Sequence, residues 1–258
     1  MALWQAIIFG IIQGATEFLP VSSSGHLFLA ESLLGSSADI GFFIWLHVGT
    51  LAAVLVYYRE TIVRLIKNPR DHRVLCLIIS SAPTFVIAAV WKLFMPEGTE
   101  KYLLPFGFLA TFVLLLLNKN NPQAVKSISS MQIKDALIVG AVQGLAIIPG
   151  LSRSGSTVSA LRFSGYGREE SGEYSFLLSV PVILGGAAAD VFEAVLHGKS
   201  LFSGGTPLDC VNKAVGVFIS ATVGLIALGA VEKLLKSGNF RKFAWYLPVP
   251  LLLSILLL

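Results

Sequence analysis

Long apolar runs separated by short polar segments dominate the hydropathy pattern of this chain. Six of the runs approach or exceed the roughly 18 residues that are needed to cross a bilayer core of about 30 Å. They cover approximately residues 41–58, 74–95, 102–118, 174–196, 213–232 and 243–258. The last run contains Pro248 and Pro250, which predict a kink. The pattern predicts an all-α polytopic membrane protein with about six transmembrane helices.

Two shorter apolar runs, 4–19 and 136–148, each lead into a segment rich in proline, glycine and serine, followed by another short helical pattern. The lysines and arginines mark the cytoplasmic side. They concentrate in segments 59–73, 119–134, 162–168 and 233–242. If six helices cross the membrane, the basic segments all fall on one side only if segments 4–35 and 133–163 do not cross. Each of these two segments must return to the side from which it entered. We therefore predict two re-entrant helix-loop-helix hairpins, the first beginning outside and the second inside.

The two hairpin sequences resemble each other. AIIFGIIQGATEFLPVSSSG begins at residue 6, and ALIVGAVQGLAIIPGLSRSG begins at residue 136. At a constant offset of 130, the matching positions are Gly10 and Gly140, Gln13 and Gln143, Gly14 and Gly144, and Gly25 and Gly155. The two similar hairpins are predicted to enter from opposite sides of the membrane. This predicts an inverted-topology repeat, approximately 1–118 and 133–258, within a single membrane domain of residues 1–258. A chance likeness between two loops rich in glycine and serine is the alternative.

Such repeats meet near the bilayer midplane around a site. Irregular polar backbone at that depth must be covered by protein or by a water-filled cavity. We therefore expect the tips of the hairpins, residues 17–26 and 149–157, to share one polar pocket.

Ionisable residues are rare, because only 13% of the chain is charged. Glu17, His26 and Arg153 all fall in the two tips, and ionisable groups inside a membrane are functional candidates by default. The net charge of +4 is explained by the basic loops, so no nucleic-acid partner is expected. Cys76 and Cys210 show no metal-binding or redox spacing.

The second tip, PGLSRSGST, has the composition of a phosphate cradle. A guanidinium grips phosphate oxygens with two parallel hydrogen bonds, and N–H groups at a helix start also attract anions. Arg153 would supply the charge, and hydroxyl donors would come from Ser152, Ser154 and Thr157. The alternative is a capped turn whose arginine reaches towards water.

The first tip adds an acid, an amide and hydroxyls. Gln13 and Glu17 lie on one helix face and are oxygen ligands for a hard divalent cation such as Mg²⁺. Glu17 could instead accept a proton, or form a structural pair with Arg153. His26 could act as a general acid or base, or take the phosphoryl group itself. The serine hydroxyls, available for attack or for phosphate binding, belong to Ser22, Ser23 and Ser24.

His47 lies within the run 41–58. It could line the same cavity, but the sequence favours a structural role for it.

QGATEFLPVSSSGH and PGLSRSGST resemble the two signature motifs of the undecaprenyl-diphosphate phosphatase family, the bacitracin-resistance type. The resemblance extends over the whole chain. It implies hydrolysis of undecaprenyl diphosphate to undecaprenyl phosphate and phosphate, which recycles the lipid carrier of cell-wall synthesis. The family's acidic motif falls on Gln13 and Glu17, and glutamine at the first of these positions removes one carboxylate from the expected metal site.

The resemblance, together with the residues, yields a set of expectations. The catalytic residues are Glu17, Ser23, His26 and Arg153, with the nucleophile open among Ser22, Ser23, His26 and water. The substrate-binding residues are Gln13, Ser22, Ser24, Ser152, Ser154 and Thr157. A divalent cation, Mg²⁺ or Ca²⁺, binds at Gln13 and Glu17.

The protein is expected in the bacterial inner membrane, with its site facing outward. Its partners are the lipid substrate and membrane lipid, and a homodimer is left open. A lipid-phosphate flippase or transporter, and a phosphatase for another lipid diphosphate, remain as alternatives.

Overall fold

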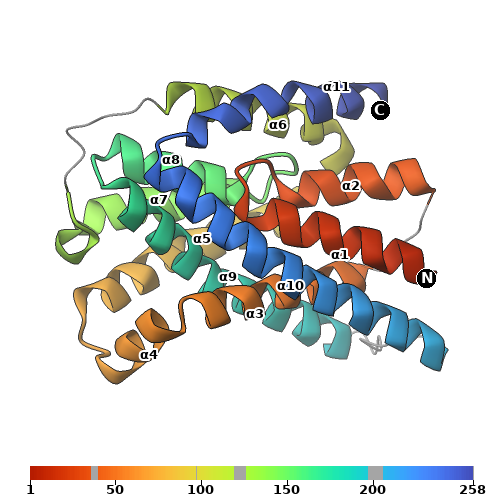
Figure 1. Cartoon of the computed structure of the whole chain (residues 1–258), viewed down its shortest axis with the longest axis horizontal. Coiled ribbons are helices and arrows are strands. Elements are labelled where there is room, and N and C mark those ends of the chain that lie inside the picture. The colour runs from red at the N-terminus through yellow and green to blue at the C-terminus, as the bar shows by residue number, and fades with distance from the viewer. Residues whose placement is uncertain (36–39, 97, 119–125, 197–205, 258) are drawn as a thin grey trace.

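The computed structural model describes residues 1–35, 40–96, 98–118, 126–196 and 206–257, and this part of the chain is all-helical (Figure 1). Its α-helices are α1 (Leu3–Phe18), α2 (Ser23–Leu34), α3 (Ile40–Tyr57), α4 (Arg59–Lys67), α5 (His72–Phe94), α6 (Glu100–Leu117), α7 (Ile133–Leu145), α8 (Arg153–Phe163), α9 (Arg168–Leu196), α10 (Pro207–Lys236) and α11 (Pro248–Leu256). Two 3-10 helices, η1 (Ile128–Ser130) and η2 (Phe240–Tyr246), complete the described secondary structure apart from one isolated bridge.

Within the described residues, four helices are long and apolar enough to cross a membrane: α5, α6, α9 and α10. α3 and α4 add a fifth candidate only as a pair, and they meet at a bend of 78°. The protein is therefore a polytopic membrane protein, as predicted, with four or five candidate spans.

The predicted sixth span, 243–258, is not a continuous helix. The chain forms η2 up to Tyr246 and then α11, which has nine residues. A helix of that length rises only about 14 Å. Pro248 stands at the start of α11 and has no N–H with which to continue a helical ladder from η2. η2 and α11 are thus two short helices divided at Pro248, where the sequence predicted a kink within one long helix.

Two helix-loop-helix hairpins, α1–α2 and α7–α8, occupy the positions predicted for the short apolar runs. α1 lies along α10, and α7 lies along α5. The Met1 ammonium group is 2.9 Å from an Asp209 carboxylate oxygen at the start of α10, while His72 at the start of α5 is 2.7 Å from the Met131 carbonyl just before α7. Each hairpin therefore begins beside the start of the helix on which it packs.

The glycines that recur at the offset of 130 allow these close contacts. A Cβ atom on Gly14 would lie 2.8 Å from the backbone nitrogen of Gly224 in α10. A Cβ on Gly144 would lie 3.2 Å from the Cα of Thr84 in α5. Hairpin and span approach backbone to backbone, and a larger side chain at these positions would separate them.

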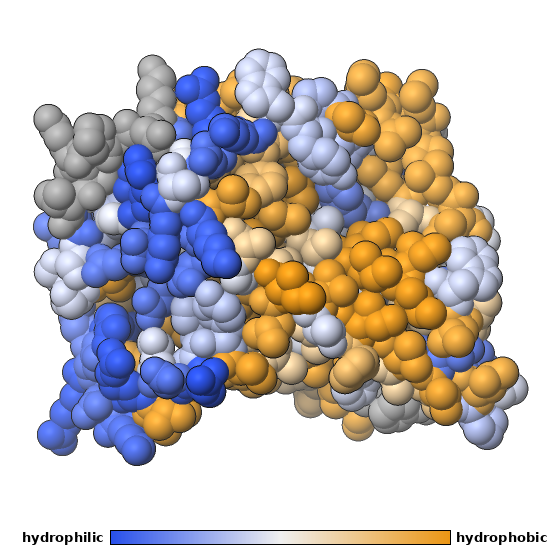
Figure 2. All heavy atoms as spheres, in the orientation of Figure 1, coloured by the Kyte–Doolittle hydropathy of each residue, from blue (hydrophilic) through white to orange (hydrophobic). Residues whose placement is uncertain are grey.

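The outer surface is apolar over much of its area. Figure 2 shows polar residues gathered at the end of the molecule where α4 lies and apolar residues over much of the remaining face. Large apolar side chains, including Phe106, Val195, Phe218 and Ile226, are more than half exposed. Such a surface would be unfavourable in water, and it fits a chain surrounded by lipid.

We expect the substitution Gly140→Ala to loosen the α5–α7 contact, because its methyl group would overlap the Ser80 carbonyl and lie 2.8 Å from Pro83 Cγ. Overpacking of this kind costs about 1–3 kcal/mol and should lower the melting midpoint of the detergent-solubilised protein by roughly 2–10 °C. Gly167→Ala is the matched control, since nothing lies within 4 Å of its added methyl. Equal midpoints for the two variants would contradict this packing.

Candidate active site

The structure brings the two hairpin tips together. A Cβ on Gly25 would lie 3.1 Å from the Cα of Gly150, and one on Gly155 would lie 3.2 Å from Pro20 Cβ. The Ser154 hydroxyl donates a hydrogen bond of 3.1 Å to the Leu19 carbonyl. Each tip therefore packs against the loop of the other, although more than 100 residues separate them in the chain.

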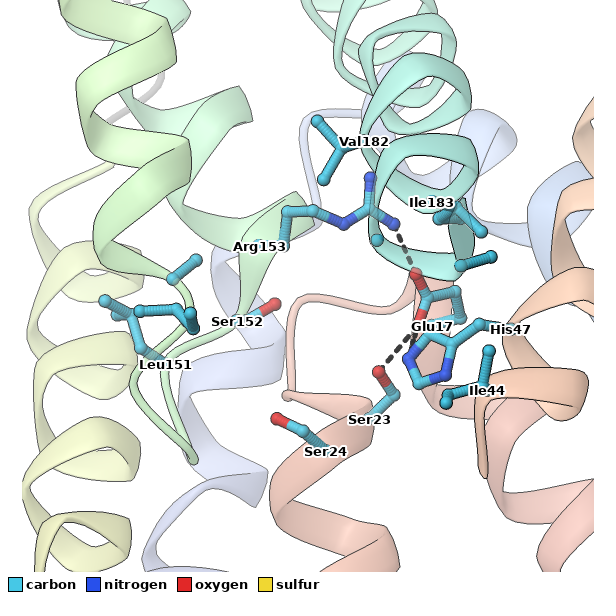
Figure 3. Close-up of a pocket in the computed structure, with 14 residues that line it drawn as sticks. Glu17, Ser23, Ser24, Ile44, His47, Leu151, Ser152, Arg153, Val182 and Ile183 are labelled. Carbon is cyan, nitrogen blue, oxygen red and sulfur yellow. Dashed lines mark hydrogen bonds and ion pairs between the residues drawn. The ribbon is translucent and has the colours of Figure 1, made fainter. Parts of the chain in front are cut away.

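The Glu17 carboxylate lies at the centre of this contact and is buried. Oε1 pairs with the Arg153 guanidinium from the opposite tip. Oε2 accepts hydrogen bonds from the Ser23 hydroxyl at 2.6 Å and from Gln13 Nε2 at 2.9 Å. His47 Nε2 lies 3.7 Å from the same oxygen. Figure 3 shows Glu17 and Arg153 pointing towards one another, with Ser23 below them and His47 beside them.

A cavity of about 330 Å³ opens beside this carboxylate. That volume is at the small end of the range for ligand pockets. Its polar lining comes from both tips and from α3: Glu17, Ser23, Ser24, His47, Ser152 and Arg153. Its apolar lining includes Ile44, Ile147, Leu151, Val182 and Ile183. The pocket therefore has a charged and hydroxyl-bearing floor and an apolar wall, a combination suited to an amphiphilic anion.

Two predicted ligands of the second tip, Ser154 and Thr157, make hydrogen bonds within the protein. The Ser154 hydroxyl donates a hydrogen bond to the Leu19 carbonyl. The Thr157 hydroxyl donates one of 2.9 Å to the Arg153 carbonyl and lies 2.5 Å from Ser175 Oγ. Neither lines the cavity. Ser152, in contrast, lines it and also caps α8 by accepting a hydrogen bond of 3.1 Å from the Gly155 N–H. Ser152 and Arg153 thus present the second tip to the pocket.

The predicted residues of the first tip also divide into two groups. Ser23 and Ser24 line the cavity, whereas Ser22 and His26 do not. The Ser22 hydroxyl is buried and accepts a hydrogen bond from the Gly25 N–H at 3.3 Å. The His26 ring is directed to the Ser22 carbonyl and to Tyr246 of η2.

Two residues at the site were not predicted to work there. His47, for which the sequence favoured a structural role, lines the pocket beside Glu17. Thr111 of α6 holds the second tip: its hydroxyl lies 2.9 Å from the Gly150 carbonyl and accepts a 2.9 Å hydrogen bond from the Ser152 N–H. A single threonine in an apolar span carries no sequence signal for such a contact, because hydroxyls in helices are commonly satisfied by their own backbone.

The residues that could hold a cation are few. Over the described part of the chain, no group of three or more histidine, cysteine, aspartate or glutamate side chains has the geometry of a metal site. The buried Gln13 Oε1 has no hydrogen-bond partner among the described residues, and Gln13 Nε2 contacts Glu17. Glu17 lines the cavity, whereas Gln13 is fully buried and does not line it. Among the described residues, the cavity itself therefore offers one carboxylate to a cation.

Comparison with known proteins identifies relatives over almost the whole chain. The family model described as bacitracin resistance protein BacA matches residues 6–251. The undecaprenyl-diphosphatase of Treponema denticola is 38% identical and covers 99% of this chain and 97% of its own. That of Carboxydothermus hydrogenoformans is 35% identical, covering 95% of this chain and 94% of its own. That of Methanococcus maripaludis is 32% identical, with 94% and 95% covered.

We expect the substitution Thr111→Val to destabilise the tip that carries Arg153. Valine has nearly the same shape as threonine but leaves the buried Ser152 N–H without an acceptor, which costs about 1–3 kcal/mol. Thr111→Ser, which keeps the hydroxyl, is the control. Thermal unfolding in detergent should separate the two variants, and a valine variant as stable as the serine variant would show that this hydrogen bond is dispensable.

Proposed function

Because the chain belongs to the bacitracin resistance protein BacA family and is an undecaprenyl-diphosphatase, we propose that the pocket between the two tips cleaves the terminal phosphate from undecaprenyl diphosphate. The products are undecaprenyl phosphate and inorganic phosphate. One observation carries this assignment to the pocket: the buried Glu17 carboxylate bonds Ser23 from one tip and Arg153 from the other. The Ser23 hydroxyl, the Glu17 carboxylate and the Arg153 guanidinium thus line a single cavity.

Ser23 is the nucleophile in this proposal. Its hydroxyl donates to Glu17 Oε2 at 2.6 Å and lines the cavity, whereas Ser22 and His26 lie outside it. Glu17 accepts the Ser23 proton as the oxygen attacks the terminal phosphorus. The bond from that phosphorus to the bridging oxygen breaks, and undecaprenyl phosphate leaves. Water then hydrolyses the phosphoserine, which releases phosphate and restores the hydroxyl.

Arg153 stabilises the charge of the phosphoryl group. Its planar guanidinium can hold two phosphate oxygens at once, while hydroxyl donors from Ser24 and Ser152 line the same cavity. The apolar wall formed by Ile44, Val182 and neighbouring side chains accepts the first part of the prenyl chain. The rest of the chain can then stay in the lipid while the headgroup enters the pocket.

We further propose that the two hairpins form an inverted-topology repeat and that the pocket opens to the outer face. α5 begins at the basic segment 59–73 and α10 ends at the basic segment 233–242, so α1 and α7, which begin beside the starts of these helices, run in opposite directions. Two residues that line the pocket show its depth: His47 lies in the first half of α3, and Gly186 lies in the second half of α9. α3 ends beside the basic segment 59–73, and α9 begins at the basic segment 162–168. Both positions favour the half of the membrane away from the basic loops.

We propose that a divalent cation, Mg²⁺ or Ca²⁺, binds beside Glu17 as a partner of the substrate. Glu17 offers a carboxylate, and the buried Gln13 Oε1 has no hydrogen-bond partner within the described part of the chain. Both are hard oxygen ligands, and such cations commonly complete their coordination with water and phosphate oxygens. When bound, the cation would neutralise phosphate charge. We propose that Gln13 and Glu17 would hold it.

A glutamate at position 13 tests this cation site. Gln13→Glu adds a second carboxylate, so we expect it to lower the Mg²⁺ concentration that gives half-maximal phosphate release by at least about threefold, since ligand charge tunes affinity. Gln132→Glu, an exposed position just before α7, is the control. The same Mg²⁺ dependence in wild type and in Gln13→Glu would remove Gln13 from the site.

Phosphate release by the purified protein from a polyprenyl diphosphate in detergent tests the proposed function. Arg153→Lys should lower turnover by at least about 100-fold, because lysine offers a point charge in place of the planar fork. Arg59→Lys, at an exposed position on α4, should match wild type.

Near-wild-type turnover by Arg153→Lys would show that the cradle is misassigned. Translocation of the lipid headgroup in liposomes without any phosphate release would instead support the transporter alternative.

A further inference from the structure

Both ring nitrogens of His26 make hydrogen bonds to protein groups, and His26 does not line the pocket. Nδ1 lies 2.7 Å from the Ser22 carbonyl oxygen, and Nε2 lies 2.8 Å from the Tyr246 hydroxyl. A carbonyl oxygen can only accept, so Nδ1 carries the proton, and in the neutral ring Nε2 accepts from the tyrosine. The ring also stacks on Tyr246 with an interplanar angle of 13° and meets the edge of Phe108. His26 is thus restrained at both nitrogens and contacts two aromatic rings.

The residue that His26 holds has an unusual backbone conformation. Ser22 has φ of 71°, and within the described residues it is the one non-glycine residue with positive φ. A residue with a Cβ atom occupies this region only where its surroundings enforce it. The hydrogen bond from His26 Nδ1 to the Ser22 carbonyl is a direct local restraint on that conformation.

The second hairpin provides an internal comparison. Ser152 occupies the position equivalent to Ser22 and caps its helix in the same way, accepting from the N–H three residues on, yet its φ is −71°. The position equivalent to His26 is Ser156, whose buried hydroxyl has no partner among the described residues. Capping is therefore common to both tips, and the positive φ occurs in the tip that has the histidine.

The conformation of Ser22 bears directly on the next residue. Ser23 follows it as the first residue of α2 and directs its hydroxyl to Glu17 at 2.6 Å. A change of Ser22 to ordinary φ would rotate the peptide that joins the two serines and move this hydroxyl.

We infer that His26 is a positioning residue, which is restrained by Tyr246, holds Ser22 at positive φ and so directs the Ser23 hydroxyl to Glu17. This inference rests on the proposed function, in which Ser23 attacks the phosphorus. His26 does not carry a proton or a phosphoryl group in the reaction. Tyr246 belongs to η2, 220 residues away along the chain, so the C-terminal segment takes part in building the site.

A double-mutant cycle with Ser22→Gly and His26→Ala tests the inference in the full-length protein. Glycine adopts positive φ without strain and is also tolerated at a helix N-cap. We expect His26→Ala to lower kcat for phosphate release at least about 100-fold in the wild-type background but less than about 10-fold in the Ser22→Gly background, because glycine no longer needs the restraint.

Equal losses in the two backgrounds would overturn the inference, because a proton or phosphoryl carrier is needed whatever residue stands at position 22. A folded Ser22→Gly protein with less than about a tenth of wild-type kcat would also overturn it, since glycine should keep Ser23 in place. Melting midpoints establish that each variant is folded.

A second readout separates positioning from proton transfer. Tyr246→Phe keeps the stacked ring but removes the brace, so we expect kcat to fall several-fold while the pH profile keeps its shape. Loss of one limb of the profile in Tyr246→Phe or in His26→Ala would assign the histidine to proton transfer. Absence of phosphate release from the wild-type protein would instead overturn the proposed function itself, so the two failures are distinguishable.

Discussion

The pairing of Glu17 with Arg153 is the interaction on which the arrangement of the two hairpins depends. A buried charge without a partner is costly, and the Glu17 carboxylate and the Arg153 guanidinium offset each other. Because one comes from α1 and the other from the start of α8, the pair can form only when the two tips meet. The contact between the tips and the lining of the pocket therefore depend on the same ion pair.

The spans provide the surfaces that hold the tips at this meeting point. Lipid supplies little driving force for helix association, so close packing and interhelical hydrogen bonds must do so. The recurring glycines let α1 approach α10 and α7 approach α5, and Thr111 of α6 fastens the backbone on either side of Leu151. These contacts hold the backbone that carries Ser152 and Arg153 beside Glu17.

The two hairpins share a backbone plan but differ in chemistry. Both keep the glycines, the glutamine and the capping serine, while Glu17, Ser23 and His26 stand opposite Ile147, Arg153 and Ser156. At these three positions the first tip carries a carboxylate, a hydroxyl and an imidazole, and the second carries an isoleucine, a guanidinium and a hydroxyl. In the first tip, which has the histidine, Ser22 has a positive φ of 71°. In the second tip, the equivalent Ser152 has a negative φ of −71°. Two hairpins of similar sequence thus contribute different side chains to one pocket.

The sequence by itself determined the membrane class, the two hairpins and the grouping of Glu17, Ser23 and Arg153, because hydropathy, glycine spacing and rare intramembrane charges are local properties. It could not show that the final run divides at Pro248 into two short helices, since a proline is compatible with either a kink or a break. Only the tertiary structure decided that His47 enters the pocket while His26 turns to Tyr246. The direction of a side chain depends on neighbours that are distant along the chain, and no local pattern records them.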